Sequence, residues 1–320
     1  TDFIQSIIMS VALIIVFIFG INIAGGIPAV VENAQSLPGY LTMMTTYDPV
    51  AGVEQPYPII NIISMIAWGL GYFGMPHILL RFMAIEDEEK LTLSRRVATI
   101  WVVISLAVAV LIGVIGLAMS DVGALKTLTG SDSETIIVQI ADLLSKHGIL
   151  PALLAGTILA GILASTMSTA DSQLLAASSA VSSDLFGDRV AKTGDKKKAM
   201  NAARFTLLAI AVIAAFIARD PNSSVFGIVS FAWAGFGAVF GPVVLFALFW
   251  RRSNWQGALA GMISGGAMVF IWKYLVRPLG GVWNIYELLP AFSVSCLMIV
   301  IVSLLTKAPS KEITEEFDRV

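Results

Sequence analysis

Residues 161–186 read GILASTMSTADSQLLAASSAVSSDLF, and this stretch decides which kind of fold the chain can adopt. It begins as apolar sequence of the kind that spans a membrane, and it then fills with hydroxyl groups and the carboxylate of Asp171. Lipid penalises exposed polar groups, so a helix of this composition must face other protein segments or a water-filled cavity. The stretch therefore predicts one wall of a polar site inside a membrane protein.

The composition of the whole chain agrees with that prediction. Of 320 residues, 57% are hydrophobic and 13% are charged, whereas about a quarter of the residues in a soluble domain are charged. The mean hydropathy is +0.85. Apolar runs of about 20 residues, long enough to cross a ~30 Å hydrocarbon core, recur without the alternation of a membrane barrel. We predict an all-α polytopic membrane protein in contact with lipid, with no soluble domain and no nucleic-acid partner.

Eight membrane spans account for the apolar runs. If residue 2 is cytoplasmic, 15 of the 20 Lys and Arg residues fall on the cytoplasmic side, as the positive-inside rule expects. The basic segment 184–201 is the clearest cytoplasmic marker, and the tail 307–320 is then cytoplasmic too. A short amphipathic helix is expected at 135–147. The spans lie at about 3–31, 58–82, 95–119, 149–183, 203–219, 225–250, 257–276 and 287–306.

The second span is irregular at its middle. Residues 68–77 read WGLGYFGMPH and place three glycines and a proline within nine positions. Proline removes a helix hydrogen bond and glycine lowers the cost of unwinding, so we expect a broken helix. Secondary transporters bind solute and ions at such breaks. Trp68 and Tyr72 are four positions apart and would wall a pocket together, although a plain proline kink packed with aromatic residues explains the same pattern.

The fourth span offers oxygen ligands for a cation. Ser168, Thr169 and Ser172 place oxygens on nearly adjacent faces, and hard cations such as sodium prefer oxygen. The alternative is that these hydroxyls bond back to carbonyls one turn earlier and hold helices together. Asp171 is costly in a membrane unless it is paired or hydrated, and we expect it to face an inward vestibule. Asp2, taken alone, indicates an N-terminal cap.

Small residues elsewhere indicate close packing. The sixth span contains AGFGAVFGP at 234–242, which is either a second flexible element or, as we favour, a packing surface. Two further sets of glycines predict faces where helices approach closely. They are Gly113 with Gly116, and Gly257 with Gly261 and Gly265.

Three motifs together resemble the sodium:solute symporter family. They are WGLGYFGMPHI at 68–78, MSTADSQLL at 167–175 and SFAWAGFGAVFGP at 230–242. The likeness runs from residue 2 to about residue 310, and it is to the bacterial members of that family that carry proline.

The resemblance implies the leucine-transporter type of fold, with two inverted repeats of five helices. On that map, span 3–31 is the last helix of repeat one, residues 58–250 form repeat two, and residues 257–306 form peripheral helices. The whole of 1–320 is then one transmembrane transporter domain. Four core helices of repeat one, which carry the other half of the site, are expected to lie outside this sequence.

The resemblance also implies roles for individual residues. The hydroxyls of Ser168 and Thr169 and the carbonyl of Ser165 correspond to ligands of a sodium ion. Asp2 corresponds to an aspartate tied to sodium coupling, which replaces its interpretation as a cap. The positions that line the proline pocket correspond to Trp68, Tyr72 and Pro76.

The function implied is sodium-coupled symport of L-proline across the cytoplasmic membrane, with sodium as coupling ion, no other cofactor and no catalytic residue. Residues 170–172 follow the wider family, so another amino acid, a carboxylate, a sugar or sialic acid stays open as the solute. A non-transporting sensor module on the same fold is a second alternative. An intramembrane enzyme is disfavoured, because neither of the two histidines lies beside a nucleophile.

Overall fold

The computed structural model describes residues 2–180, 196–220 and 224–319. The described chain is mostly helical and forms two compact units. A two-stranded hairpin, β1 (Thr45–Asp48) and β2 (Val53–Pro56), provides residues to both. Unit 1 consists of Thr1–Leu41, Tyr47–Val53 and Glu88–Ser224, and unit 2 consists of Thr42–Thr46, Glu54–Asp87 and Val225–Val320.

Within the described residues, seven helices are long and apolar enough to cross a membrane. An eighth apolar segment, Ile59–Gly74, is shorter and lies where the irregular second span was predicted. The prediction of an all-α polytopic membrane protein is confirmed. The long segments are Gln5–Ile23, Lys90–Asp121, Ile149–Ser179, Met200–Ile217, Val225–Phe249, Trp255–Leu279 and Leu288–Leu305.

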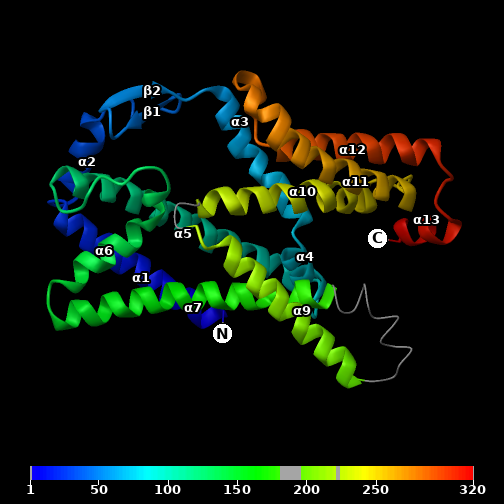
Figure 1. Cartoon of the computed structure of the whole chain (residues 1–320), viewed down its shortest axis with the longest axis horizontal. Coiled ribbons are helices and arrows are strands. Elements are labelled where there is room, and N and C mark those ends of the chain that lie inside the picture. Colours follow the sequence, from blue (N-terminus) through cyan, green and yellow to red (C-terminus); the bar gives the residue numbers. More distant parts are fainter. Residues whose placement is uncertain (1, 181–195, 221–223, 320) are drawn as a thin grey trace. The chain divides into compact units, whose positions relative to one another are not determined.

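Unit 1 is built around a core of large aliphatic side chains, in which Val16, Met119, Ile140 and Ile158 are fully buried. In this unit α1 packs on α5 and α7, and α6 packs on α7 (Figure 1). The helices are α1 (Asp2–Ile23), α2 (Ile27–Ser36), α5 (Lys90–Asp121), α6 (Ile136–Ser145), α7 (Ile149–Ser179) and α9 (Lys196–Ile217), with a 3₁₀ turn at Gly130–Thr135.

The first predicted span, 3–31, is wrong at its C-terminal end. Helix α1 stops at Ile23, and α2 begins at Ile27. Gly25 and Gly26 between them have φ values of +93° and +95°, which side-chain-bearing residues rarely adopt and which end a helix. The short amphipathic helix predicted at 135–147 is present as α6. Of the basic segment 184–201, residues 184–195 lie outside the described residues.

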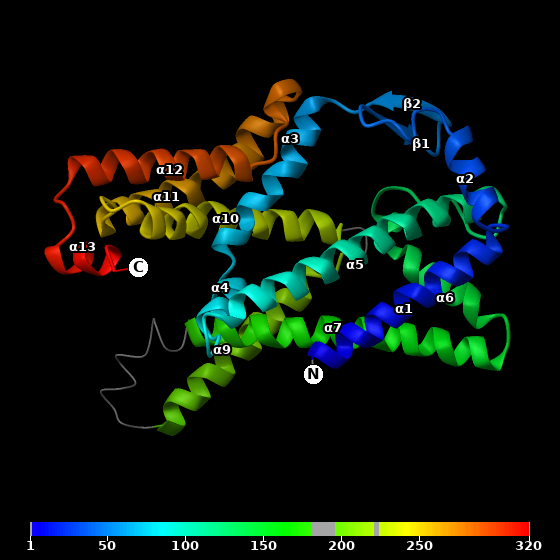
Figure 2. The same cartoon turned by 180° about the vertical axis from the view of Figure 1, so that it is seen from behind.

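Unit 2 has its core where Ala234, Ala238 and Leu288 are completely buried. Helices α11 and α12 lie side by side (Figures 1 and 2). The helices are α3 (Ile59–Ala67), α4 (Pro76–Met83), α10 (Val225–Phe249), α11 (Trp255–Ile271), α12 (Leu288–Leu305) and α13 (Lys311–Phe317). Shorter turns are the 3₁₀ segments Trp68–Gly74, Arg277–Leu279 and Gly281–Trp283 and the π-helical Trp272–Val276.

The glycine faces predicted for close packing are mostly confirmed. A methyl group at Gly261 would lie 2.9 Å from Ile299 Cδ1, so α11 and α12 approach each other through this small-residue face. A methyl group at Gly116 would meet the Ile136 side chain at 2.6 Å. Gly113 differs, because no atom of the described structure lies within 4 Å of that position.

Candidate functional site

The three residues predicted to bind sodium lie on α7 of unit 1, within one turn of the helix. The hydroxyl of Thr169 donates a hydrogen bond of 3.2 Å to the main-chain carbonyl of Ser165. Thr169 is exposed, whereas Ser165 and Ser168 are half-buried. The structure therefore brings the Ser165 carbonyl and the Thr169 hydroxyl together, as their spacing of four positions requires.

This contact is the back-bonding that we gave as the alternative to a cation site. Ser172 makes the same kind of bond, 3.0 Å to the Ser168 carbonyl, and Thr166 makes one of 2.9 Å to the Ile162 carbonyl. A carbonyl oxygen and a hydroxyl oxygen each keep a lone pair when they share a hydrogen bond, so both can also face one cation. The donor set contains only neutral oxygens, which suits a hard monovalent ion, and α7 supplies one side of such a site.

Helix α7 is fixed by polar contacts at both ends of its hydroxyl-rich half. Gln5 on α1 donates from Nε2 to the Ala164 carbonyl at 3.3 Å, immediately before Ser165. Ser178 donates to the Ala203 carbonyl on α9 at 2.8 Å. The Ser178 contact shows a serine of this helix holding two helices together, which is the alternative given for the hydroxyls of the fourth span. The contact made by Gln5 could not be predicted, because a single glutamine carries no spacing signal.

Two acidic residues were singled out in the sequence. Asp2 is the first residue of α1, and its side chain lies outside the described part of the structure. Asp171 is exposed on α7. Among the described residues, no group of three His, Cys, Asp or Glu side chains could hold a metal ion.

The predicted break in the second span is present in unit 2. Helix α3 ends at Ala67, a 3₁₀ segment runs from Trp68 to Gly74, and α4 begins at Pro76. Met75 between them is extended, with φ −81° and ψ +113°. Proline disfavours a helical conformation in the residue before it and cannot donate a backbone hydrogen bond. The glycines and the proline thus produce the interruption that their types predicted.

Helix α10 crosses the chain at this break. The indole Nε1 of Trp233 donates to the carbonyl of Trp68 at 3.0 Å. The Trp233 ring stacks on Trp68 with ring centroids 5.4 Å apart, and it meets Tyr72 edge-on at 4.8 Å. Trp68 and Tyr72 therefore contact the same ring, as their shared face predicts. The second-span motif and the sixth-span motif meet through Trp233, a residue of the quoted motif to which the sequence analysis gave no role of its own.

The glycines of both motifs permit that crossing. A methyl group at Gly237 would lie 2.7 Å from Gly71 Cα, and one at Gly74 would lie 2.8 Å from the backbone nitrogen of Gly241. Distances this short are not tolerated by real side chains, so the two backbones meet directly. The packing role favoured for residues 234–242 is confirmed.

The predicted proline-pocket residues have different surroundings within unit 2. Trp68 lines a cavity of 210 Å³, which we call the Trp68 cavity. Tyr72 is half exposed and Pro76 is half-buried, and neither lines this cavity. The cavity is also lined by Asn61, Ser64, Phe226, Arg277, Asn284 and Tyr286, among others.

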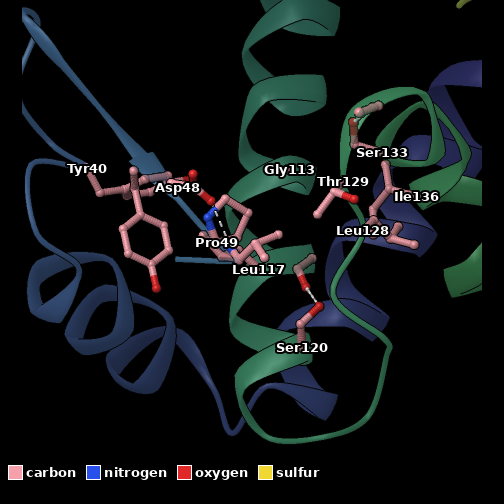
Figure 3. Close-up of a pocket in the computed structure, with 14 residues that line it drawn as sticks. Tyr40, Asp48, Pro49, Gly113, Leu117, Ser120, Leu128, Thr129, Ser133 and Ile136 are labelled. Atoms are coloured by element: carbon pink, nitrogen blue, oxygen red, sulfur yellow. Dashed lines mark hydrogen bonds between the residues drawn. The ribbon is translucent and has the colours of Figure 1, made fainter. Parts of the chain in front are cut away.

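A larger cavity, of 470 Å³, lies in unit 1 (Figure 3). It is lined by Tyr40, by Asp48 at the end of β1, and by Ser120 and Thr129, and it contains none of the predicted site residues. The Asp48 carboxylate accepts hydrogen bonds from the backbone N–H groups of Ala51 and Val50, and these hold the pKa of Asp48 below its ordinary value. The Asp48 carboxylate thus stabilises the loop that follows β1.

The family model and the similar proteins found by comparison agree with each other. The model of the sodium:solute symporter family matches residues 1–265. The high-affinity proline transporter PutP of Bacillus subtilis is 39% identical over 99% of this chain and 63% of its own length. The sodium/proline symporters of Salmonella typhimurium and Escherichia coli are 38% and 37% identical over 99% of this chain and 60% of theirs. The chain thus spans about three fifths of the length of these relatives.

Proposed function

The chain belongs to the sodium:solute symporter family, and on that premise we propose that it forms part of a sodium-coupled symporter that carries L-proline. The observation that carries the proposal is the break in the second span, where the Trp68 carbonyl accepts a hydrogen bond from the indole of Trp233. Interrupted helices supply backbone groups to solute and ions in secondary transporters. The printed names of the relatives supply the solute.

We assign the sodium ion to α7. The Ser165 carbonyl and the Thr169 hydroxyl, which are 3.2 Å apart, form one edge of its coordination shell, and the Ser168 hydroxyl adds a third oxygen. Asp2, at the start of α1, acts in sodium coupling. The remaining ligands come from other segments of the symporter. Sodium supplies the driving force and takes part in no covalent step.

We assign the solute to the break, with Trp68, Tyr72 and Pro76 in its binding pocket. Sodium must bind the outward-open state more tightly than the inward-open state, because a ligand shifts an equilibrium only by its difference in affinity. The fold is the inverted-repeat type, with residues 58–250 as repeat two and residues 257–306 as peripheral helices. The distribution of 15 of 20 basic residues supports a cytoplasmic location for tail 307–320 in the cytoplasmic membrane.

The test is uptake of radiolabelled L-proline by the full-length protein in proteoliposomes. Thr169→Ala should raise the sodium concentration needed for half-maximal uptake, and Thr169→Ser, which keeps a hydroxyl, should restore it. Thr166→Ala is the matched control, because Thr166 makes the same back-bond to the preceding turn. If all three variants need the same sodium concentration for half-maximal uptake, the assignment of the sodium ion to α7 is wrong. If excess unlabelled proline does not reduce the uptake of the radiolabel, proline is not the solute.

A further inference from the structure

We propose that the larger cavity of unit 1, which we call the Asp48 cavity, binds a small organic cation through the Asp48 carboxylate and the rings of Tyr40 and Tyr47. The inference goes beyond the proposed function and does not depend on it. All residues that line this cavity belong to unit 1, and none of them is assigned to the sodium ion or to the solute. Its volume of 470 Å³ lies within the range of pockets that bind small molecules, roughly 300–1,000 Å³.

One face of helix α5 forms the floor of the cavity. It consists of Gly113, Gly116, Leu117 and Ser120, whose spacing along the helix places them on the same side. Gly113 is the position at which no described atom lies within 4 Å of an added methyl group. The cavity accounts for this open space, because a side chain at Gly113 would occupy the room that a ligand can fill.

Two segments enclose the floor from opposite sides. Figure 3 shows Tyr40 and Asp48 on one side of α5, and Thr129, Ser133 and Ile136 on the other. The first side carries an aromatic ring and a carboxylate, whereas the second carries two hydroxyls and an aliphatic side chain. The cavity therefore offers different chemistry to the two ends of one ligand.

Two tyrosine rings form an aromatic corner of the cavity. Tyr40 and Tyr47 meet edge-on, with ring centroids 6.4 Å apart and ring planes at 87°, and both residues are half-buried. The face of an aromatic ring attracts a cation that lies within about 6 Å of its centre, and cages of such rings recognise quaternary ammonium groups. The corner thus suits an ammonium group that carries apolar substituents.

The charges around the cavity favour a cation. Asp48 is the one charged residue among the described residues that line it. The opposite wall, residues 128–136, adds Asp132 and Glu134 and no basic residue. Lys126, close to that wall in the sequence, lines a neighbouring cavity instead. These four side chains carry three negative charges and one positive charge, so a cation is attracted and an anion is repelled.

Backbone hydrogen bonds hold the Asp48 carboxylate in place and in its ionised form. Its Oδ1 accepts from the N–H groups of Val50 at 2.9 Å and Ala51 at 3.1 Å, and these bonds lower the pKa of Asp48. The negative charge is shared by both carboxylate oxygens, so it still attracts an ammonium group while these bonds are made. A Ca²⁺ ion takes six to eight oxygen ligands, so a single carboxylate in so large a cavity suits an organic cation better.

A hydroxyl on the floor can recognise a polar group of the same ligand. Ser120 Oγ donates to the Gly116 carbonyl at 3.0 Å and keeps lone pairs that can accept a hydrogen bond from a ligand hydroxyl. Choline combines a quaternary ammonium group with a hydroxyl, and it has no carboxylate. It is therefore a suitable probe of the Asp48 cavity.

The experiment measures equilibrium binding of radiolabelled choline to the full-length protein in detergent solution. Saturable binding is expected for the wild type, and an excess of proline with sodium should not displace it. The neutral analogue in which carbon replaces the quaternary nitrogen should not compete, because it has the shape of choline without the charge. Asp48→Asn keeps an acceptor for the loop but loses the charge, and it should weaken choline binding about fivefold.

Two pairs of variants test the aromatic corner and the floor. Tyr40→Phe keeps the ring and should bind choline as the wild type does, whereas Tyr40→Leu should bind it more weakly. Gly113→Leu fills the floor and should abolish binding. Gly156→Leu is its matched control and should keep the wild-type affinity, because Gly156 lies on α7 outside the cavity and also has no described atom within 4 Å of an added methyl group.

The site is excluded if the wild type shows no saturable choline binding, if proline or the neutral analogue displaces choline, or if Asp48→Asn keeps the wild-type affinity. Equal losses in Gly113→Leu and Gly156→Leu would also exclude it, because the effect would not be local to the cavity. The melting temperature of each variant checks its fold. Loss of sodium-dependent proline uptake with choline binding intact would overturn the proposed function and leave the Asp48 cavity as a binding site.

Discussion

The indole nitrogen of Trp233 donates a 3.0 Å hydrogen bond to the main-chain carbonyl of Trp68, 165 positions away in the sequence. That carbonyl lies where α3 gives way to the 3₁₀ segment, and the indole on α10 gives it a hydrogen-bond donor from a distant part of the chain. The same indole covers Gly71, where a methyl group would collide with it. The Trp233 side chain therefore provides a hydrogen-bond donor for the Trp68 carbonyl at the break and fills the space beside Gly71.

The first prediction concerns this hydrogen bond. Trp233→Phe keeps an aromatic ring in place but removes the donor, and it should lower the stability of the full-length protein by about 1 kcal/mol. Thermal unfolding in a fixed detergent measures the change. Trp255→Phe is the control, because Trp255 is 71% exposed and should tolerate the substitution. Equal melting temperatures for Trp233→Phe and the wild type would show that the Trp68 carbonyl does not depend on the indole.

The second prediction compares two glycines on one helix. Gly237→Ala places a methyl group 2.7 Å from Gly71 Cα, and overpacking of this kind costs about 1–3 kcal/mol. Gly235→Ala is two positions away, where no described atom lies within 4 Å, so it should be neutral or stabilising by up to about 1 kcal/mol. Thermal unfolding of both variants tests the contact. If both tolerate alanine equally, α10 does not cross the break as closely as the structure shows.

The position of the break could be predicted from the sequence because glycine and proline act on their own backbone. Pro76 has no N–H to donate, and its ring restricts Met75, so their effect needs no distant partner. The partner of Trp68 could not be predicted in this way. Trp233 is 165 positions away from it, and only the folded unit brings the two residues together.

The C-terminal end of the first predicted span and the hydroxyl-rich part of α7 show the same difference. The apolar run continues through Ile27 and Val31, and hydrophobicity alone therefore merges α1 with α2. The Gly25-Gly26 pair was the available signal, because consecutive glycines permit the positive φ values that stop the helix. On α7, by contrast, helix geometry alone places the Thr169 hydroxyl beside the Ser165 carbonyl. The other ligands of a cation would come from other segments, and the sequence of α7 does not indicate which segments these are.

The third prediction is a pH dependence in the hairpin loop. The Asp48 carboxylate accepts from the N–H groups of Ala51 and Val50, which lowers its pKa from the ordinary 3.8. Its contribution to the loop is therefore fully present above pH 3.8 and is lost as the pH falls through the lower pKa of the folded chain. Hydrogen–deuterium exchange of the hairpin peptide should be faster in Asp48→Ala at neutral pH. Asp48→Asn keeps a neutral acceptor and should remove the pH dependence. If Asp48→Ala exchanges at the same rate as the wild type, the Asp48 carboxylate does not stabilise the turn.

The fourth prediction compares two buried serines of α12. Within the described structure the Ser295 hydroxyl is completely buried and has no hydrogen-bond partner, whereas the Ser303 hydroxyl donates to Asn254 Oδ1 at 3.3 Å. Burying an unsatisfied hydroxyl costs about 1–3 kcal/mol, so Ser295→Ala should leave the melting temperature of the full-length protein unchanged or raise it.

Ser303→Ala should lower the melting temperature, because Asn254 also caps α11 through a 2.8 Å bond from the Gly257 N–H and loses a partner when the hydroxyl is removed. Both variants remove one oxygen atom from a fully buried position on the same helix, so the difference between them isolates the hydrogen bond. Thermal unfolding in one detergent at one protein concentration measures it. A larger loss of stability for Ser295→Ala than for Ser303→Ala would mean that the Ser295 hydroxyl has a partner, and that the interface between α11 and α12 is not the apolar, small-residue contact described for Gly261.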